Sequence, residues 1–189
     1  MKSERRIFLV GLMGAGKTTV GKVLARDLGM DFVDADQELQ RRTGVTIPVI
    51  FDIEGEAGFR VREAAVLEEL TQRDGIVLAT GGGAVLREDN RERLKSRGTV
   101  IYLRASLEDL WTRTRHDRNR PLLQTPDPKA RFAELLAERD PLYREVADIV
   151  MDTGRQSVQV LARRIENRLS EARGTDADTT EQLNANPDR

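Results

Sequence analysis

Residues 11–18, GLMGAGKT, have the types and spacing needed to bind the phosphate groups of a nucleotide. They match the pattern G-x-x-x-x-G-K-[ST], whose glycines let the chain wrap so that successive backbone N–H groups point at phosphate oxygens. Lys17 can reach the β- and γ-phosphates, the Thr18 hydroxyl can bind Mg²⁺, and the helix that follows directs its positive end at the anion. The alternative is a glycine-rich turn beside an exposed lysine. We predict a site for a purine nucleoside triphosphate with Mg²⁺, made by Gly14, Ala15, Gly16, Lys17, Thr18 and Thr19.

Two carboxylates stand where a second substrate would bind. Asp34 and Asp36 follow the apolar run 31–34, and ligands of open parallel sheets collect beyond the carboxyl ends of the strands. If the chain stays extended there, both side chains project from the same side, toward the phosphate loop. One could hold the metal through its water shell while the other meets an acceptor hydroxyl. Alternatively, one of them caps a helix beginning near Gln37, and Asp36 is the better placed for that.

Three consecutive glycines, Gly81, Gly82 and Gly83, follow the apolar run 76–79. P-loop enzymes usually place a metal-organising acidic residue on such a strand, and its absence here favours Asp34 for that task. The glycines would expose backbone N–H groups and let a small ligand lie flush against the chain. The alternative is a flexible turn, for which one or two glycines would suffice.

Elements that could position these residues alternate along the chain. Short apolar runs predict five strands, at 6–10, 31–34, 76–79, 99–103 and 148–151. Helical periodicity predicts helices at 17–28, 56–72, 90–97, 106–115, 128–138 and 156–172. This alternation indicates an α/β fold with a parallel sheet covered on both faces. Residues 35–62 are too long for one crossover helix, and the Arg- and Pro-rich residues 114–128 indicate a mobile excursion.

Composition excludes several classes of protein. The formal charge is −1, with 31 basic and 32 acidic residues, so no global field would attract nucleic acid or a membrane. The lack of Cys excludes disulfides and thiol chemistry, and the single His excludes His-rich metal sites. We expect a cytoplasmic, monomeric protein with one domain over 1–173 and a disordered polar tail over 174–189.

The chain resembles shikimate kinase in five segments that keep the family's order: GLMGAGKTTVGKVLA, DFVDADQELQRRTGVTIPVIFDIEGEAGFR, LATGGGAV, RNRPLL and ERDPLYREVAD. The resemblance extends from residue 5 to about residue 170. It implies the three-layer fold of nucleoside monophosphate kinases, with a five-stranded parallel sheet in the order 2-3-1-4-5. It also implies a substrate-binding region at about 35–62, a lid at about 114–128, and transfer of the γ-phosphoryl group of ATP to the 3-hydroxyl of shikimate.

Residue roles follow from the same resemblance. Asp36 would contact the ring hydroxyls and act as the base, while Thr18 and, through water, Asp34 would serve Mg²⁺. The lid would bring Arg120 toward the phosphates, acting there with Lys17. Three groups would hold the shikimate carboxylate: Arg60, Arg139 and the backbone of the glycine run around Gly82. Arg113 and Arg155 would border the adenine, although DTGRQSVQ departs from the Asn- and Pro-containing pattern of relatives.

From residue types and spacing alone, these arginines could also be structural. Arg60 has Glu56 at i−4 and Glu63 at i+3, which also suits a solvated helix face. Arg139 precedes Pro141 at a predicted helix end, where any cation complements the dipole. As a pair, the two would supply the planar forks that a small carboxylate needs.

The arginine-rich segment 111–120 could bind nucleic acid, but it lacks interleaved aromatic residues beyond Trp111 and the overall charge gives no support. We therefore expect a charged flap over triphosphate, with Trp111 packed and His116 exposed. Two other functions stay open: a gluconate or nucleotide kinase on the same scaffold, and a nucleotide-dependent binding module without transferase activity.

Overall fold

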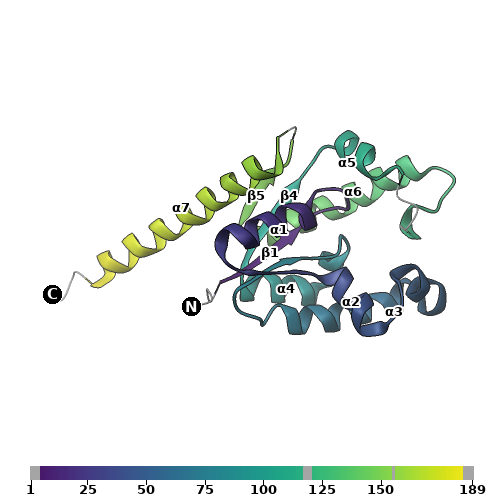
Figure 1. The fold of residues 1–189 in the computed structure, drawn as a ribbon, viewed down its shortest axis with the longest axis horizontal. Coiled ribbons are helices and arrows are strands. Elements are labelled where there is room, and N and C mark those ends of the chain that lie inside the picture. Colours follow the sequence, from purple (N-terminus) through teal and green to yellow (C-terminus); the bar gives the residue numbers. More distant parts are fainter. Residues whose placement is uncertain (1–4, 117–120, 155, 185–189) are drawn as a thin grey trace.

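The computed structural model describes residues 5–116, 121–154 and 156–184, with side chains described as far as residue 172 (Figure 1). Five strands form one parallel sheet: β1 (Arg6–Val10), β2 (Asp31–Asp34), β3 (Ile76–Ala79), β4 (Thr99–Arg104) and β5 (Ile149–Asp152). Their order is β2-β3-β1-β4-β5, which confirms the predicted topology. Each predicted strand lies within one residue of the observed one. The three central strands β1, β3 and β4 are buried on both faces, and such strands are written as continuous apolar runs.

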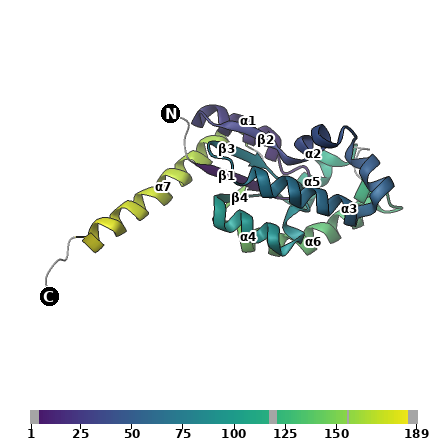
Figure 2. The ribbon, with the colours of Figure 1, turned by 90° about the horizontal axis from the view of Figure 1, so that it is seen from below.

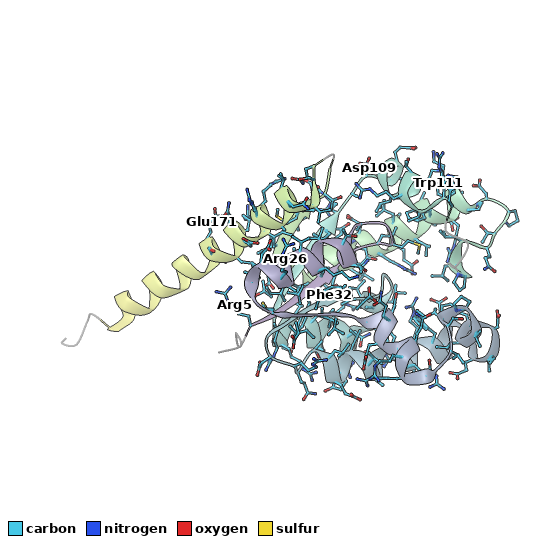
Figure 3. The ribbon with its side chains drawn as sticks, in the orientation of Figure 1. Arg5, Arg26, Phe32, Asp109, Trp111 and Glu171 are labelled. Atoms are coloured by element: carbon cyan, nitrogen blue, oxygen red, sulfur yellow. The ribbon has the colours of Figure 1, made fainter. Side chains whose placement is uncertain are left out.

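Helices cover the two faces of this sheet. Helix α1 (Lys17–Leu28) packs beside α7 (Val158–Asn184) on one face, and α4 (Glu88–Arg97) and α6 (Pro128–Val146) cover the other (Figure 2). The layered α/β class is thereby confirmed. The short helix α5 (Leu107–Thr114) packs against α6. Trp111 of α5, labelled in Figure 3, makes an edge-on contact with Phe132 of α6 with 6.3 Å between ring centroids, so it is packed as predicted.

Residues 35–62 fold as two helices, α2 (Ala35–Thr43) and the first part of α3 (Ile47–Leu70). Helix α3 is interrupted at Gly55, whose φ of 69° and ψ of −177° no helix contains. Only glycine adopts this conformation without strain. The predicted helix start at residue 56 is therefore the point where α3 resumes after the kink.

Helix α6 corrects a predicted boundary. The sequence predicts a helix end at Arg139, before Pro141, but the helix continues to Val146 with Pro141 inside it. Proline removes one backbone hydrogen bond, and burial of Tyr143 and Val146 on the same helix stabilises the continuation. Arg139 consequently lies in mid-helix, so complementing a helix dipole does not explain it.

Helix α7 runs to Asn184, where the sequence predicts a polar tail without regular structure after residue 173. Its last turns project from the body of the molecule (Figure 1). Extending an existing helix avoids the cost of nucleation, which allows a polar sequence to continue it. Within the described residues, no helix is both long and apolar enough to cross a membrane.

Candidate active site

One cavity of about 930 Å³ lies at the carboxyl ends of the strands. It brings the P-loop, the two aspartates, the triple glycine and three arginines together, as the sequence predicts. Arg120 and Arg155 lie outside the described residues. The predicted site residues that line the cavity are Gly14, Ala15, Gly16, Lys17, Thr18, Thr19, Asp34, Asp36, Arg60, Gly81, Gly82, Gly83, Arg113 and Arg139.

The P-loop connects β1 to α1 and ends in a glycine that caps the helix. Gly16 has a φ of 95°, and α1 begins directly after it. Gly14 has a φ of 82°, and a Cβ there would lie 2.6 Å from the Cγ2 of Thr114. Both positions therefore require glycine. The Lys17 ammonium donates to the carbonyl of Gly11 at 2.6 Å, so the side chain folds back over the loop.

Thr18 and Asp34 meet at the start of α1. The Thr18 hydroxyl donates to Oδ2 of Asp34 at 2.7 Å, while Oδ1 of Asp34 accepts from the backbone N–H groups of Asp36 (3.1 Å) and Gln37 (3.2 Å). Asp34 is thus the N-cap of α2, and the expectation that Asp36 is better placed for that role was wrong. The helix begins at Ala35, two residues earlier than expected, which puts the Asp36 carboxyl in the first turn, facing the cavity.

The triple glycine is explained mainly by the protein's own side chains. A Cβ at Gly81 would lie 2.5 Å from Oε1 of Glu63 and 2.9 Å from Oδ1 of Asp36. A Cβ at Gly83 would overlap the guanidinium of Arg60. At Gly82 the nearest atom would be 3.5 Å away. The outer two glycines therefore make room for site side chains, whereas a Cβ at the middle one would make only ordinary van der Waals contacts.

Arg60 is largely shielded from solvent, with a side chain 11% exposed. Its guanidinium pairs with Glu63 at 2.8 Å and with Glu56 at 2.8 Å. The two partners are those that the helix spacing predicts, but the alternative of a solvated face for Arg60 was wrong. All three nitrogens of its guanidinium donate to these two glutamates, and Arg60 lines the cavity.

Glu63 is a site residue that the sequence analysis treated only as a surface partner. It is 2% exposed, and its Oε1 has no hydrogen-bond partner among the described residues. Burial raises the pKa of the Glu63 carboxyl, and the nearby Arg60 opposes that shift. The signal was an acidic residue on the core stripe of α3, whose other buried members after the kink are Phe59, Ala64, Val66, Leu67 and Leu70.

Arg139 differs from Arg60 in having no carboxylate partner. It is 2% exposed, lines the cavity, and has an Nε atom without a hydrogen-bond partner. No ion pair joins it to any residue that the structure describes. A buried guanidinium is costly unless an anion pairs with it, so this one is suited to an anionic ligand.

Arg113 lies at the nucleotide end of the cavity. Its guanidinium donates to the carbonyl of Gly14 at 3.1 Å and to the carbonyl of Gly154 at 3.3 Å. It thus connects the P-loop to the turn between β5 and α7. His116, two residues after the end of α5, is exposed as predicted.

Comparisons with known proteins agree with this geometry. A model of the shikimate kinase family matches residues 13–170. Shikimate kinase from Cupriavidus pinatubonensis is 65% identical over 166 residues, which cover 88% of this chain and 86% of that protein. Shikimate kinase from Chromobacterium violaceum is 61% identical over 168 residues, covering 89% and 91% of the two chains.

A solved structure is similar over the same span. The structure of shikimate kinase from Acinetobacter baumannii in complex with shikimate superposes with a TM-score of 0.88 at 51% identity. The match covers 90% of this chain and 96% of the other. Sequence and fold therefore agree over nearly all of the described body.

Proposed function

Because this chain belongs to the shikimate kinase family, and is thus an ATP-dependent kinase of the shikimate pathway to aromatic amino acids, we propose that it transfers the γ-phosphoryl group of ATP to the 3-hydroxyl of shikimate. One observation carries this proposal most directly. The unpaired, buried Arg139 lines the same cavity as Lys17 and Asp36. A carboxylated acceptor could pair with the arginine while its hydroxyl faces the phosphate loop.

Arg60 and Arg139 hold the acceptor carboxylate in this proposal. Guanidinium groups bind carboxylates through two parallel N–H donors, which fixes orientation as well as charge. The role of Arg60 rests on its alignment by Glu63 and Glu56. The relative from Acinetobacter baumannii was solved with shikimate, which supports the same ligand here.

Asp36 is the proposed base. Phosphoryl transfer demands alignment and neutralisation of charge more than covalent participation by the protein. Asp36 orients the acceptor hydroxyl and takes its proton, while Lys17, the P-loop N–H groups and Arg120 stabilise the charge on the transferred group. The nucleotide site consists of residues 14–19, with Arg113 and Arg155 beside the adenine.

Thr18 and Asp34 suit Mg²⁺. A hydroxyl and a carboxylate oxygen, 2.7 Å apart beside the phosphate-binding lysine, are hard oxygen donors of the kind this ion prefers. Bound there, Mg²⁺ would neutralise charge on the β- and γ-phosphates. The Thr18 hydroxyl would bind it directly, and Asp34 would act through water.

Further parts of the proposal concern organisation. We propose one domain over 1–173 that acts as a monomer in the cytoplasm, with 35–62 forming the acceptor region and 114–128 closing as a lid. Closure would exclude water, which otherwise competes with the acceptor for the γ-phosphoryl group. The polar character of residues 174–189 supports a tail outside the catalytic unit.

A panel assay separates this proposal from its rivals. ADP formation is measured with ATP and Mg²⁺ against shikimate, gluconate and AMP, and again after chelation of the metal. We expect turnover with shikimate alone and its loss with EDTA. Turnover with gluconate or AMP would indicate a different kinase on this scaffold. Tight ATP binding without ADP formation from any acceptor would indicate a binding module.

Gly83→Ala should weaken acceptor binding by moving Arg60. The added Cβ overlaps the guanidinium, which can shift because it is the end of a flexible side chain. We expect little change in melting temperature but a rise of about tenfold in the KM for shikimate, since small displacements of positioning groups are costly. The KM for ATP should not change.

A double variant tests the cause. If the alanine acts only by displacing the guanidinium, it should have almost no further effect on shikimate KM in an Arg60→Ala background. Additive effects of the two substitutions would show that Gly83→Ala acts elsewhere in the loop.

A further inference from the structure

Tyr143 of α6 contacts the triple glycine from the helix that also carries Arg139. Its side chain is fully buried, and its hydroxyl donates a hydrogen bond to the carbonyl of Gly82. It lies one helical turn after Arg139, so the two side chains share a face of α6. Burial raises the pKa of the Tyr143 hydroxyl, and the nearby Arg139 opposes that shift.

We infer that Tyr143 is a positioning residue for the acceptor carboxylate, aligning the Gly82 backbone and the Arg139 guanidinium together. This inference rests on the proposed function. The hydroxyl itself does not line the cavity, whereas Gly82 and Arg139 both do. Tyr143 would therefore act through these two groups rather than by touching the substrate.

The hydrogen bond to Gly82 sets the direction of a whole peptide unit. In a planar trans peptide, the N–H of Gly83 points opposite to the carbonyl of Gly82. Holding that carbonyl toward Tyr143 therefore directs the N–H away from it. A loop of three glycines has little conformational preference of its own, so an external hydrogen bond is needed to choose one orientation.

The guanidinium of Arg139 needs similar support. It is buried without a carboxylate partner among the described residues, so no ion pair sets its orientation. The Tyr143 hydroxyl is the polar side-chain group of α6 nearest in sequence on that face of the helix. If the Tyr143 ring is held rigidly beside the Arg139 guanidinium, it can restrict that guanidinium to the orientation that binds a carboxylate.

The ring of Tyr143 is itself fixed by a second buried tyrosine. Tyr102 of β4 contacts it with 5.0 Å between ring centroids and an angle of 33° between ring planes. The Tyr102 hydroxyl donates to Oδ1 of Asp140 at 2.7 Å, and Arg144 pairs with the other carboxylate oxygen of Asp140 at 2.6 Å. Neither Tyr102 nor Asp140 lines the active-site cavity. Tyr102 is therefore a matched control: it is equally buried, and its hydroxyl is bonded away from the site.

The test compares Tyr143→Phe with Tyr102→Phe. Each variant loses one buried hydroxyl from the same aromatic pair, so both should lower the melting temperature. For Tyr143→Phe alone, we expect the KM and the calorimetric Kd for shikimate to rise about tenfold, a scale set by the cost of leaving a buried carbonyl unsatisfied. The KM for ATP should stay within about twofold of wild type in both variants.

An uncharged acceptor shows whether the carboxylate is involved. With shikimate methyl ester, the difference in KM between wild type and Tyr143→Phe should shrink to about twofold, because Arg60 and Arg139 no longer pair with a charge on the acceptor. Equal losses for the acid and the ester would overturn the inference. So would equal losses of shikimate affinity in the two tyrosine variants.

The outcomes distinguish this inference from the proposed function. If wild type neither binds nor phosphorylates shikimate, both are wrong. If wild type binds and phosphorylates shikimate but Tyr143→Phe behaves as Tyr102→Phe does, only the positioning role of Tyr143 is wrong.

Discussion

Replacing Asp36 with Asn is expected to lower the kcat for shikimate by at least ~10²-fold, the usual scale for a positioned base. The amide keeps the shape of the carboxylate but cannot take the proton of the acceptor hydroxyl. Asp36 lies in the first turn of α2 and lines the cavity shared with Lys17. The affinity for ATP, measured by calorimetry, should stay near that of wild type, because the phosphate loop is not altered.

Glu38→Gln provides the matched control. Glu38 lies two residues further along α2, where Arg41 and Arg42 hold the pKa of its carboxyl at about 2. It pairs on the outer surface of the helix and does not line the cavity, so turnover should not change. The lost pairing should lower stability by its full amount above pH ~4.5 and by progressively less between pH ~4.5 and 2, since the stabilisation from a depressed carboxyl pKa is lost as pH falls from the unfolded pKa toward the folded one.

Unchanged turnover in Asp36→Asn would remove Asp36 from the role of base. Glu63 would then be the next carboxylate to test. Its Oε1 and the Oδ1 of Asp36 both lie within 2.9 Å of the position that a Cβ on Gly81 would take. A loss of turnover in Glu63→Gln together with retention in Asp36→Asn would transfer the role of base to Glu63.

The sequence predicts features that depend on local chemistry. The P-loop needs glycine at positions of positive φ, so Gly11 and Gly16 are visible in the pattern itself. The central strands β1 and β3 are buried along almost their whole length, which leaves an unbroken apolar run. Such features can be recognised in the sequence because few other residues could satisfy the same backbone or burial requirement.

Features that depend on distant packing were missed or misjudged. Pro141 indicates a helix end, yet burial of Tyr143 continues α6 past it, and only that continuation places Arg139 in mid-helix. Glu63 looks like a surface partner of Arg60, but in the fold it is buried beside Gly81, in the loop after β3. In each case the deciding contact joins segments far apart in the chain, which periodicity and spacing do not encode.

Arg60 and Arg139, the two arginines proposed to bind the acceptor carboxylate, differ in how their charges are balanced before the ligand binds. Arg60 is balanced by Glu63 and Glu56 before any ligand binds, so its cost of burial is already offset. Arg139 has no such partner among the described residues. A ligand carboxylate should therefore gain more from Arg139, because Glu63, the buried carboxylate that acts on this guanidinium electrostatically, is already ion-paired with Arg60. This asymmetry makes Arg139 the more informative position to change.

Arg139→Met is expected to lower kcat/KM for shikimate by about 10²–10³-fold, corresponding to the ~2–5 kcal/mol cost of truncating one partner of a buried charge pair. The loss should appear mainly in KM, since the carboxylate is remote from the reacting hydroxyl. The KM for ATP should not change. Stability should move in the opposite direction: a buried, unpaired guanidinium destabilises the free protein, so we expect an equal or higher melting temperature without ligand.

Arg131→Met is the control on the same helix, because Arg131 is partly exposed and pairs with Glu134 at 3.0 Å on the protein surface. It should leave the kinetics with shikimate unchanged and lower stability by less than ~1 kcal/mol, the usual limit for a surface pair.

Arg139→Lys separates charge from shape. A lysine keeps the positive charge but not the planar pair of N–H donors, so it should recover only part of the lost affinity for shikimate. A KM for shikimate within twofold of wild type in Arg139→Met would show that this guanidinium does not bind the acceptor. A lower melting temperature in the same variant would show that the buried charge has a partner within the protein after all.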